Sequence, residues 1–129
     1  VIVPYANPFR LYPLEKDYAK FKDLFKNMNV DCYIINTGFF LEKKVTPKVT
    51  LGLIEDIVTN EAKFEKFGPF EDLEFYAIEG FVPNFADKEY IEMVKARMAN
   101  RLEFVSDLSD FDRLPEEALA AIKKVANEI

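Results

Sequence analysis

The sequence predicts a small α/β domain, with an α+β arrangement as the alternative, in which about four helices accompany an incomplete sheet of two or three strands. Two patterns predict this class. Apolar residues recur at intervals of three and four in four separate stretches, as in helices with one apolar face. Short apolar or alternating runs between them are typical of strands. The chain has 129 residues and no internal repeat or Ser/Gly-rich linker, so residues 1–129 are expected to form one domain.

The first expected helix starts at Leu14. Three prolines between Pro4 and Pro13 favour an extended or turn-like segment before it. Asn27 and Asn29 are expected to end the helix. Its spacing predicts one buried face, made by Tyr18, Phe21, Phe25 and Met28.

Two segments are expected to form strands. Residues 32–35 are apolar and partly β-branched, which predicts a buried strand that ends in the turn at residues 36–38. Cys32 would then be a small buried hydrophobe, with a reactive thiol as the alternative. Residues 73–78 alternate between two faces, as in a strand. Residues 64–70 before them are aromatic and rich in turn formers.

Three further helices are expected. One starts at Thr46-Pro47, where a hydroxyl can cap the helix and the missing N–H of proline costs nothing. The next is capped by Asp87, and the last starts near Pro115. Their expected buried faces consist of Leu53, Ile54, Ile57 and Val58, of Ile91, Val94, Met98 and Leu102, and of Leu119, Ile122 and Val125.

Composition excludes several kinds of site from this chain. It has no His, which removes imidazole bases and the commonest zinc ligand, and its single Cys cannot form an internal disulfide or a Cys-rich metal site. The four glycines match no phosphate-loop spacing. Asp107, Asp110 and Asp112 lack the spacing of a calcium loop, which favours a solvated acidic turn over a metal site. We therefore expect no catalytic residue and no metal ligand here.

Charge and hydropathy bear on partners and location. The formal net charge of −6 repels phosphate backbones and anionic lipid, so neither nucleic acid nor a membrane is an expected partner. No apolar run approaches the roughly 20 residues that span a bilayer. The chain opens on Val1-Ile2-Val3-Pro4 without an initiator Met or a signal-peptide pattern. These features predict a cytoplasmic protein and favour a piece of a longer chain.

One cluster is a candidate for binding an anion. Lys43, Lys44 and Lys48 lie between the turn at residues 36–38 and the helix that starts at Thr46-Pro47. A helix N-terminus favours anions, and ligands of α/β sheets bind beyond the carboxyl ends of strands. The cluster predicts contact with an anion or a nucleotide. An ordinary exposed lysine turn, or a helix cap that serves stability alone, is the alternative.

Three segments share their order and spacing with one enzyme family. They are Asn7-Pro8-Phe9, the run from Cys32 to Gly38 and the run from Lys43 to Thr50. Over most of residues 4–60 the chain resembles the C-terminal region of ATP-dependent phosphoenolpyruvate carboxykinase. Beyond residue 68 the resemblance rests on an aromatic segment, a short strand and a long helix.

The resemblance implies a C-terminal fragment of a carboxy-lyase of gluconeogenesis, which converts oxaloacetate and ATP to phosphoenolpyruvate, ADP and carbon dioxide with magnesium and manganese. It implies a part of a mononucleotide-binding domain that borders the adenine end of the ATP site. The implied nucleotide-binding residues are Lys44, in place of an Arg of the family, Val45 and Thr50. Leu51 stands in place of a second Arg, and residues 39–42 replace a Gly-rich turn.

In that family the phosphate-binding loop, the metal ligands and the carboxylate-binding Arg lie upstream of the matched region, which implies that the isolated chain is inactive. Expected partners are a nucleotide, bound weakly, and the N-terminal part of the longer protein. Aromatic residues left exposed by its absence predict self-association. The alternative is a non-catalytic α/β interaction module that docks on a partner and has no nucleotide role.

Overall fold

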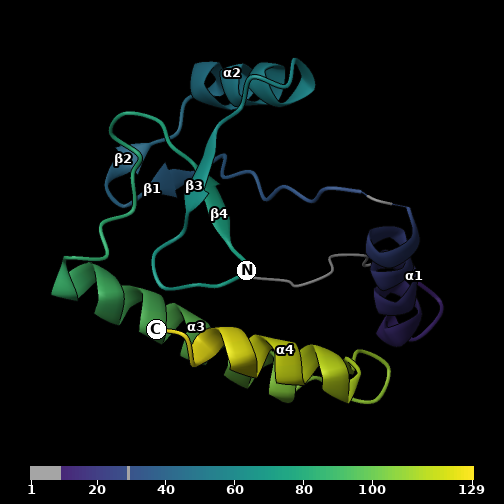
Figure 1. The fold of residues 1–129 in the computed structure, drawn as a ribbon. Coiled ribbons are helices and arrows are strands. Elements are labelled where there is room, and N and C mark those ends of the chain that lie inside the picture. Colours follow the sequence, from purple (N-terminus) through teal and green to yellow (C-terminus); the bar gives the residue numbers. More distant parts are fainter. Residues whose placement is uncertain (1–9, 29) are drawn as a thin grey trace. The chain divides into compact units, whose positions relative to one another are not determined.

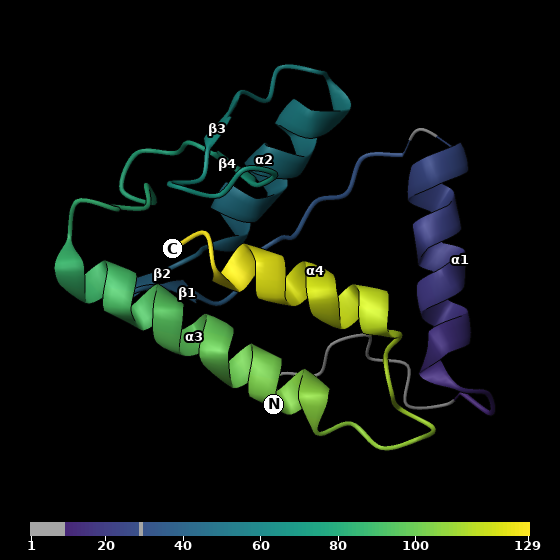
Figure 2. The ribbon, with the colours of Figure 1, turned by 60° about the horizontal axis from the view of Figure 1, so that its bottom comes forward.

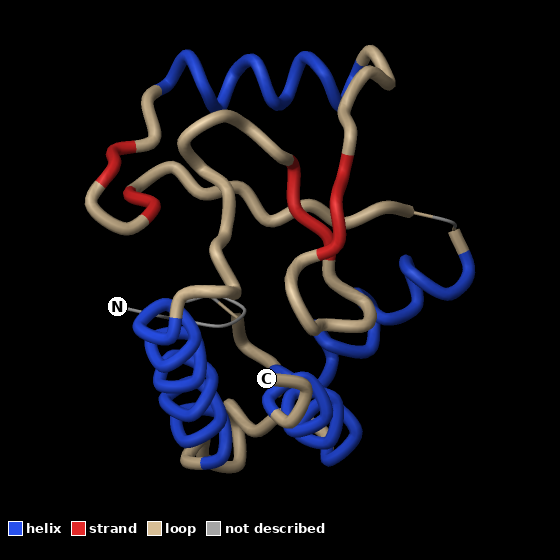
Figure 3. Tube along the Cα trace, turned by 60° about the vertical axis from the view of Figure 1, so that its left-hand side comes forward, coloured by secondary structure: helices blue, strands red, loops and turns tan. Residues whose placement is uncertain are grey.

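The computed structural model describes residues 10–28 and 30–129. Over these residues the chain forms four helices and two small antiparallel sheets of two strands each, an α+β mix (Figure 1). The expected number of helices and the small, incomplete sheet are thereby confirmed. Figure 3 shows how short the strands are beside the helices. The chain divides into two compact units, one made of the residues up to Asp31 together with Lys88–Ile129, the other of Cys32–Asp87.

The first unit is helical. It contains α1 (Leu14–Asn27), α3 (Lys88–Ser106) and α4 (Glu116–Ala126), and α4 lies alongside α3 (Figure 2). All three helices begin and end close to the residues that the sequence predicts. The buried residues of the core come from all three helices and the connection before α4: Leu14, Val105, Leu114 and Ala118.

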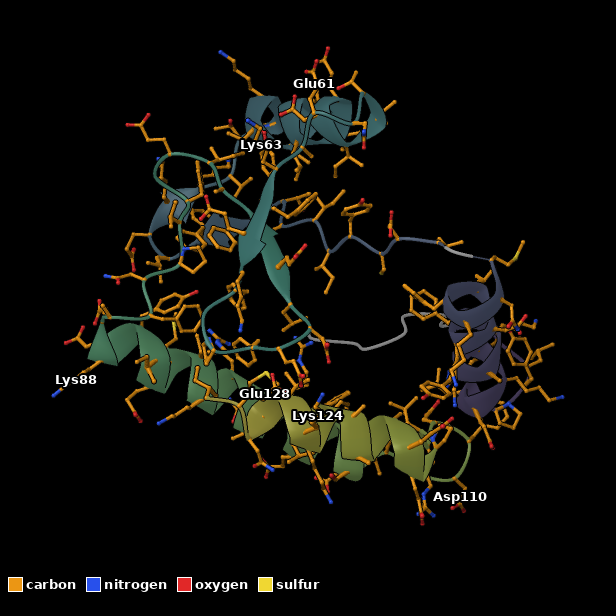
Figure 4. All side chains as sticks on the ribbon, viewed as in Figure 1. Glu61, Lys63, Lys88, Asp110, Lys124 and Glu128 are labelled. Atoms are coloured by element: carbon orange, nitrogen blue, oxygen red, sulfur yellow. The ribbon has the colours of Figure 1, made fainter. Side chains whose placement is uncertain are left out.

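Polar contacts join the same elements. The backbone N–H of Leu14 donates a hydrogen bond to the carbonyl of Phe111 at 3.0 Å. Lys22 of α1 forms an ion pair with Glu117 of α4. This pair raises the pKa of Lys22, mainly through the hydrogen bond to the carboxylate. At the other end of α4, Lys124 Nζ lies 3.9 Å from a carboxylate oxygen of Glu128 (Figure 4).

The predicted buried faces of these helices are confirmed to different degrees. The stripes of α3 and α4 are half-buried, and Val105 extends the first of them into the core. The stripe of α1 is wrong beyond its first turns: Leu14 is buried and Tyr18 is half-buried, whereas Phe21, Phe25 and Met28 are exposed. The core ends at the N-terminal half of α1, so periodicity predicted the face but not what covers it. Asn29 lies outside the described residues.

The second unit contains five elements. They are β1 (Phe39–Phe40), β2 (Lys43–Lys44), α2 (Pro47–Val58), β3 (Phe64–Lys66) and β4 (Glu74–Tyr76). β1 pairs with β2, and β3 pairs with β4. The strand expected at residues 73–78 is confirmed in its central residues, and the aromatic stretch before it contributes the strand that pairs with it.

An aromatic cluster packs where β3 and β4 are joined. Phe70 is only 1% exposed, and its ring stacks on Phe67 with centroids 5.4 Å apart. Phe85 meets Phe67 edge-on at 5.1 Å. Gly68, at φ +58°, passes so close to the Phe85 ring that an added Cβ would overlap it. The turn that the sequence predicts at Gly68 therefore allows the aromatic rings to pack closely.

Two predictions for this unit are wrong. Residues 32–35 form no strand and are exposed, Ile34 to 93% and Cys32 included. A strand needs a neighbour to satisfy its backbone groups, and no described residue pairs with this run. On α2, Leu53 and Ile57 are half-buried, but Ile54 and Val58 are exposed. Both errors place apolar residues in a core that the described chain does not build around them.

None of the helices in residues 10–28 and 30–129 is long and apolar enough to cross a membrane.

Candidate functional site

The candidate site is the continuous segment at residues 36–50, which we call the lysine hairpin segment. It begins with a turn closed by the side chain of Asn36. Its amide oxygen accepts a hydrogen bond from the N–H of Gly38 at 2.9 Å, and its amide nitrogen donates one to the carbonyl of Phe39 at 2.9 Å. An Asx turn of this kind is one reason why Asn favours turns. It directs the chain into β1.

Leu41 and Glu42 join β1 to β2, and Leu41 adopts a left-handed backbone conformation with φ 52°. Among the described residues at positive φ, Asn60, Gly68 and Gly80 are of types that adopt it readily. Leu41 is not, and such a residue stores about 1–3 kcal/mol of strain. It lies within residues 39–42, which stand where the family of the resemblance has a Gly-rich turn.

The two lysines of β2 have different surroundings. Lys44 is exposed and pairs with Phe39 of β1. Lys43 pairs with Phe40, and its ammonium lies 4.3 Å from the ring centre of Phe81, a cation–π contact. Both lysines are exposed, but of the two Lys44 is the one that has no ring or carboxylate partner among the described residues.

Val45 links the hairpin to α2. Its side chain is buried, with 8% exposed, and its backbone N–H donates a hydrogen bond to the carbonyl of Gly38 at 2.9 Å. The residue thus closes the base of the hairpin. Its side chain contributes packing, and its N–H already has a partner.

The N-terminus of α2 completes the segment. Thr46 is the N-cap and Pro47 occupies the first turn, as predicted, but the Thr46 side chain makes no capping hydrogen bond. The hydroxyl of Thr50 donates to the Thr46 carbonyl at 3.4 Å, a long hydrogen bond. No acidic residue lies in the first turn, and Lys48 is exposed there. Positive charge and the positive end of the helix dipole therefore coincide.

A hydrogen bond holds α2 to the neighbouring sheet. The Tyr76 hydroxyl of β4 donates to a carboxylate oxygen of Asp56, which raises the pKa of Tyr76, with burial and the Asp56 charge acting in the same direction. Asp56 lies near the C-terminal end of α2, whereas Lys43, Lys44 and Lys48 lie before the helix or in its first turn. The hydrogen bond therefore stabilises the helix without placing a negative charge among the lysines.

The structure places Lys44, Val45 and Thr50 on consecutive elements of one unit: β2, the link to α2 and the start of α2. Sequence reasoning missed two residues that shape the segment, Leu41 and Phe81. The first had a signal in the resemblance alone, since residues 39–42 stand where that family has a Gly-rich turn. The second had none, because it lies far along the chain.

The described residues offer no donor set for a metal ion: no three His, Cys, Asp or Glu side chains come together in a group that could hold one. Asp112, from the acidic turn, instead forms an ion pair with Arg10, whose guanidinium also lies 5.4 Å from the Phe111 ring centre. We therefore derive no metal-dependent step for this chain.

Comparison with known proteins gives one kind of support. No family model matches the chain, and no solved structure matches it. A curated protein, phosphoenolpyruvate carboxykinase (ATP) of Aeropyrum pernix, is 26% identical over 114 residues, covering 84% of this chain. The chain spans only 23% of the length of that relative. The comparison supports a distant relation between this chain and phosphoenolpyruvate carboxykinase (ATP).

Proposed function

We propose that the chain is the C-terminal portion of a phosphoenolpyruvate carboxykinase-like protein and that the lysine hairpin segment contacts the nucleotide. In this proposal the longer protein converts oxaloacetate and ATP to phosphoenolpyruvate, ADP and carbon dioxide with divalent metal ions. The chain supplies the adenine side of the nucleotide site and none of the groups that transfer the phosphoryl group. ATP and the metals are therefore ligands of the longer protein, and the isolated chain is inactive.

The observation that carries the proposal is the coincidence of three features in one segment. Lys44 is exposed, the N-terminus of α2 lacks a side-chain cap, and no acidic residue lies in its first turn. In a chain of net charge −6 this is a local reversal of sign. The distant relation supports assigning a nucleotide to it, because the name of the relative contains ATP.

The proposed roles follow from the geometry of each residue. Lys44 offers a point charge to the nucleotide, without the planar group of an Arg. Val45, buried and hydrogen-bonded to Gly38, fixes the distance between the hairpin and α2. The Thr50 hydroxyl is held near the Thr46 carbonyl by a long bond, which it can exchange for a bond to a ligand.

An NMR titration of the whole chain with ATP tests the proposal. We expect amide shifts confined to residues 43–50 and an affinity in the millimolar range, because no phosphate loop contributes. Lys44→Met, which keeps most of the stem and removes the charge, should weaken binding about two- to fivefold, the range of a solvent-exposed ion pair. Lys66→Met removes an exposed lysine from β3 of the same unit and should leave the affinity unchanged.

Two results would contradict the proposal. Either no shifts occur at millimolar ATP, or both lysine variants weaken binding equally, which would indicate a diffuse charge effect.

A second candidate, an interaction module, is favoured by the exposed apolar residues of the second unit. Ile34 is 93% exposed and Val58 is 79% exposed. In this proposal they contact the rest of a longer protein or a second copy of the chain. Light scattering should then detect self-association, and Ile34→Lys should reduce both the association and the binding of an apolar dye. A monomer that binds no dye would contradict this candidate.

A further inference from the structure

The two lysines of β2 belong to opposite faces of the hairpin. Side chains of consecutive strand residues point to opposite sides. The register pairs Lys43 with Phe40 and Lys44 with Phe39. One face therefore carries Phe40 and Lys43, and the other carries Phe39 and Lys44, both of which are exposed.

The face with Phe40 and Lys43 packs on the turn that follows β4. The Lys43 ammonium lies 4.3 Å from the ring centre of Phe81, and the ring centre of Phe40 lies 6.2 Å from the same point. A hydrogen bond from the Phe81 N–H to the Ile78 carbonyl, 2.9 Å long, closes the turn. The hairpin is thus attached to a defined turn through a cation and two rings.

Gly80 makes room for this attachment. Its φ of +79° is a conformation that glycine adopts at no steric cost. A Cβ at this position would also collide with the Lys43 ammonium. The ammonium is the far end of a flexible, exposed side chain and can move aside, so the backbone conformation is what requires glycine here.

We propose that Lys43 is a positioning residue: its contact with Phe81 orients the hairpin so that Lys44, on the opposite face, meets the nucleotide. The inference rests on the proposed function and assigns different roles to the two neighbouring lysines. Lys43 is occupied by an aromatic ring within the chain. Lys44 is the cation that contacts the ligand.

The test repeats the ATP titration on the whole chain with two pairs of variants. Phe81→Leu removes the ring and leaves every lysine in place, and Phe81→Tyr keeps the ring. Lys43→Met removes the cation, and Lys43→Arg restores it. We expect Phe81→Leu and Lys43→Met to weaken binding about two- to fivefold and the other two variants to bind like the wild type. The control is Lys66→Met, which should have no effect.

The chemical shifts of the Lys43 side chain measure its contact with Phe81 independently of ATP binding. Its ε-methylene protons should be shifted upfield by the Phe81 ring in the wild type and in Phe81→Tyr, and not in Phe81→Leu. The dispersion of the amide spectrum reports whether each variant folds. If Phe81→Leu does not fold, Phe81→Met takes its place, because it also removes the ring and leaves both lysines unchanged.

Three outcomes would overturn the inference. If Phe81→Leu loses the upfield shift and still binds ATP like the wild type, the contact does not position Lys44. If Lys43→Met alone weakens binding, Lys43 contacts the nucleotide directly. If the wild type shows no response to ATP while the upfield shift is present, the proposed function fails and the positioning role fails with it, although the contact is real.

Discussion

Replacing Leu41 by Gly and by Ala should reverse the usual order of stability of these two residues. In ordinary backbone conformations Ala is more stable than Gly by about 0.4–1 kcal/mol, because Gly loses more conformational entropy on folding. At φ 52° a Cβ costs about 1–2 kcal/mol. The difference between the two terms favours Gly by roughly 1 kcal/mol at this position.

The comparison with Ala is needed because Leu41 is only partly exposed. Its side chain is 56% exposed, so either replacement forfeits the burial of the remainder, about 1 kcal/mol. That loss is the same in both variants and cancels between them. Leu41→Gly measured against the wild type alone would mix relief of strain with lost packing and come out near zero.

Urea unfolding monitored by circular dichroism measures the difference. Leu51 of α2 is a matched control, since it is also exposed, at 64%, and lies within a helix. There Leu51→Ala should be more stable than Leu51→Gly by about 1 kcal/mol. If Ala is more stable than Gly at position 41, as it is expected to be at position 51, the left-handed conformation carries too little strain to reverse the order and the reasoning is refuted.

Three further predictions concern neighbouring features. Gly68→Ala should lower the free energy of unfolding by about 2–4 kcal/mol, because it combines positive φ with overlap on the Phe85 ring; urea unfolding measures this, and a loss below 1 kcal/mol would contradict it. Tyr76→Phe should cost about 0.5–1.5 kcal/mol at pH 7. The hydrogen bond to Asp56 raises the pKa of Tyr76 above its ordinary 10.0. The contribution of this hydrogen bond to stability is therefore complete at neutral pH and is lost as the pH rises through the raised value. The Tyr76→Phe variant should consequently lose less stability than the wild type between pH 9 and pH 12. Lys44→Arg should tighten ATP binding in the titration, because a planar guanidinium can stack on a base or bind phosphate oxygens in pairs; unchanged affinity would argue against a direct contact with the nucleotide.

The four helices could be predicted because their signals are local. Apolar spacing, the proline near the start of α1, α2 and α4, and the asparagine that ends α1 are all read within a few positions of one another, and the faces expected of α3 and α4 are half-buried. The buried strand at residues 32–35 could not be predicted correctly, because a strand is defined by its neighbour. The apolar residues of this run favour burial, but whether they are buried depends on which other segments pack against them.

For the candidate site, too, local features could be predicted from the sequence and long-range contacts could not. Lysines beside a helix start were visible in the sequence because both features are contiguous. The contact of Lys43 with Phe81 was not visible, since it joins residues far apart in the chain. Nor did the sequence show that Val45 would be buried with its N–H already bonded. Local chemistry predicted the candidate residues, and long-range packing determines which of their groups are already engaged within the chain.

Two differences from the family of the resemblance lie in the hairpin, and both reduce the geometric recognition of a ligand. Leu41 stands in the left-handed turn where glycines would let a backbone approach a ligand closely. Lys44 replaces an Arg whose planar group could stack on a base or bind in pairs. Lys44 keeps the positive charge, whereas Leu51, in place of a second Arg, loses one. Under the proposed function the hairpin therefore contacts the nucleotide through the point charge of Lys44 and not through a planar stacking group.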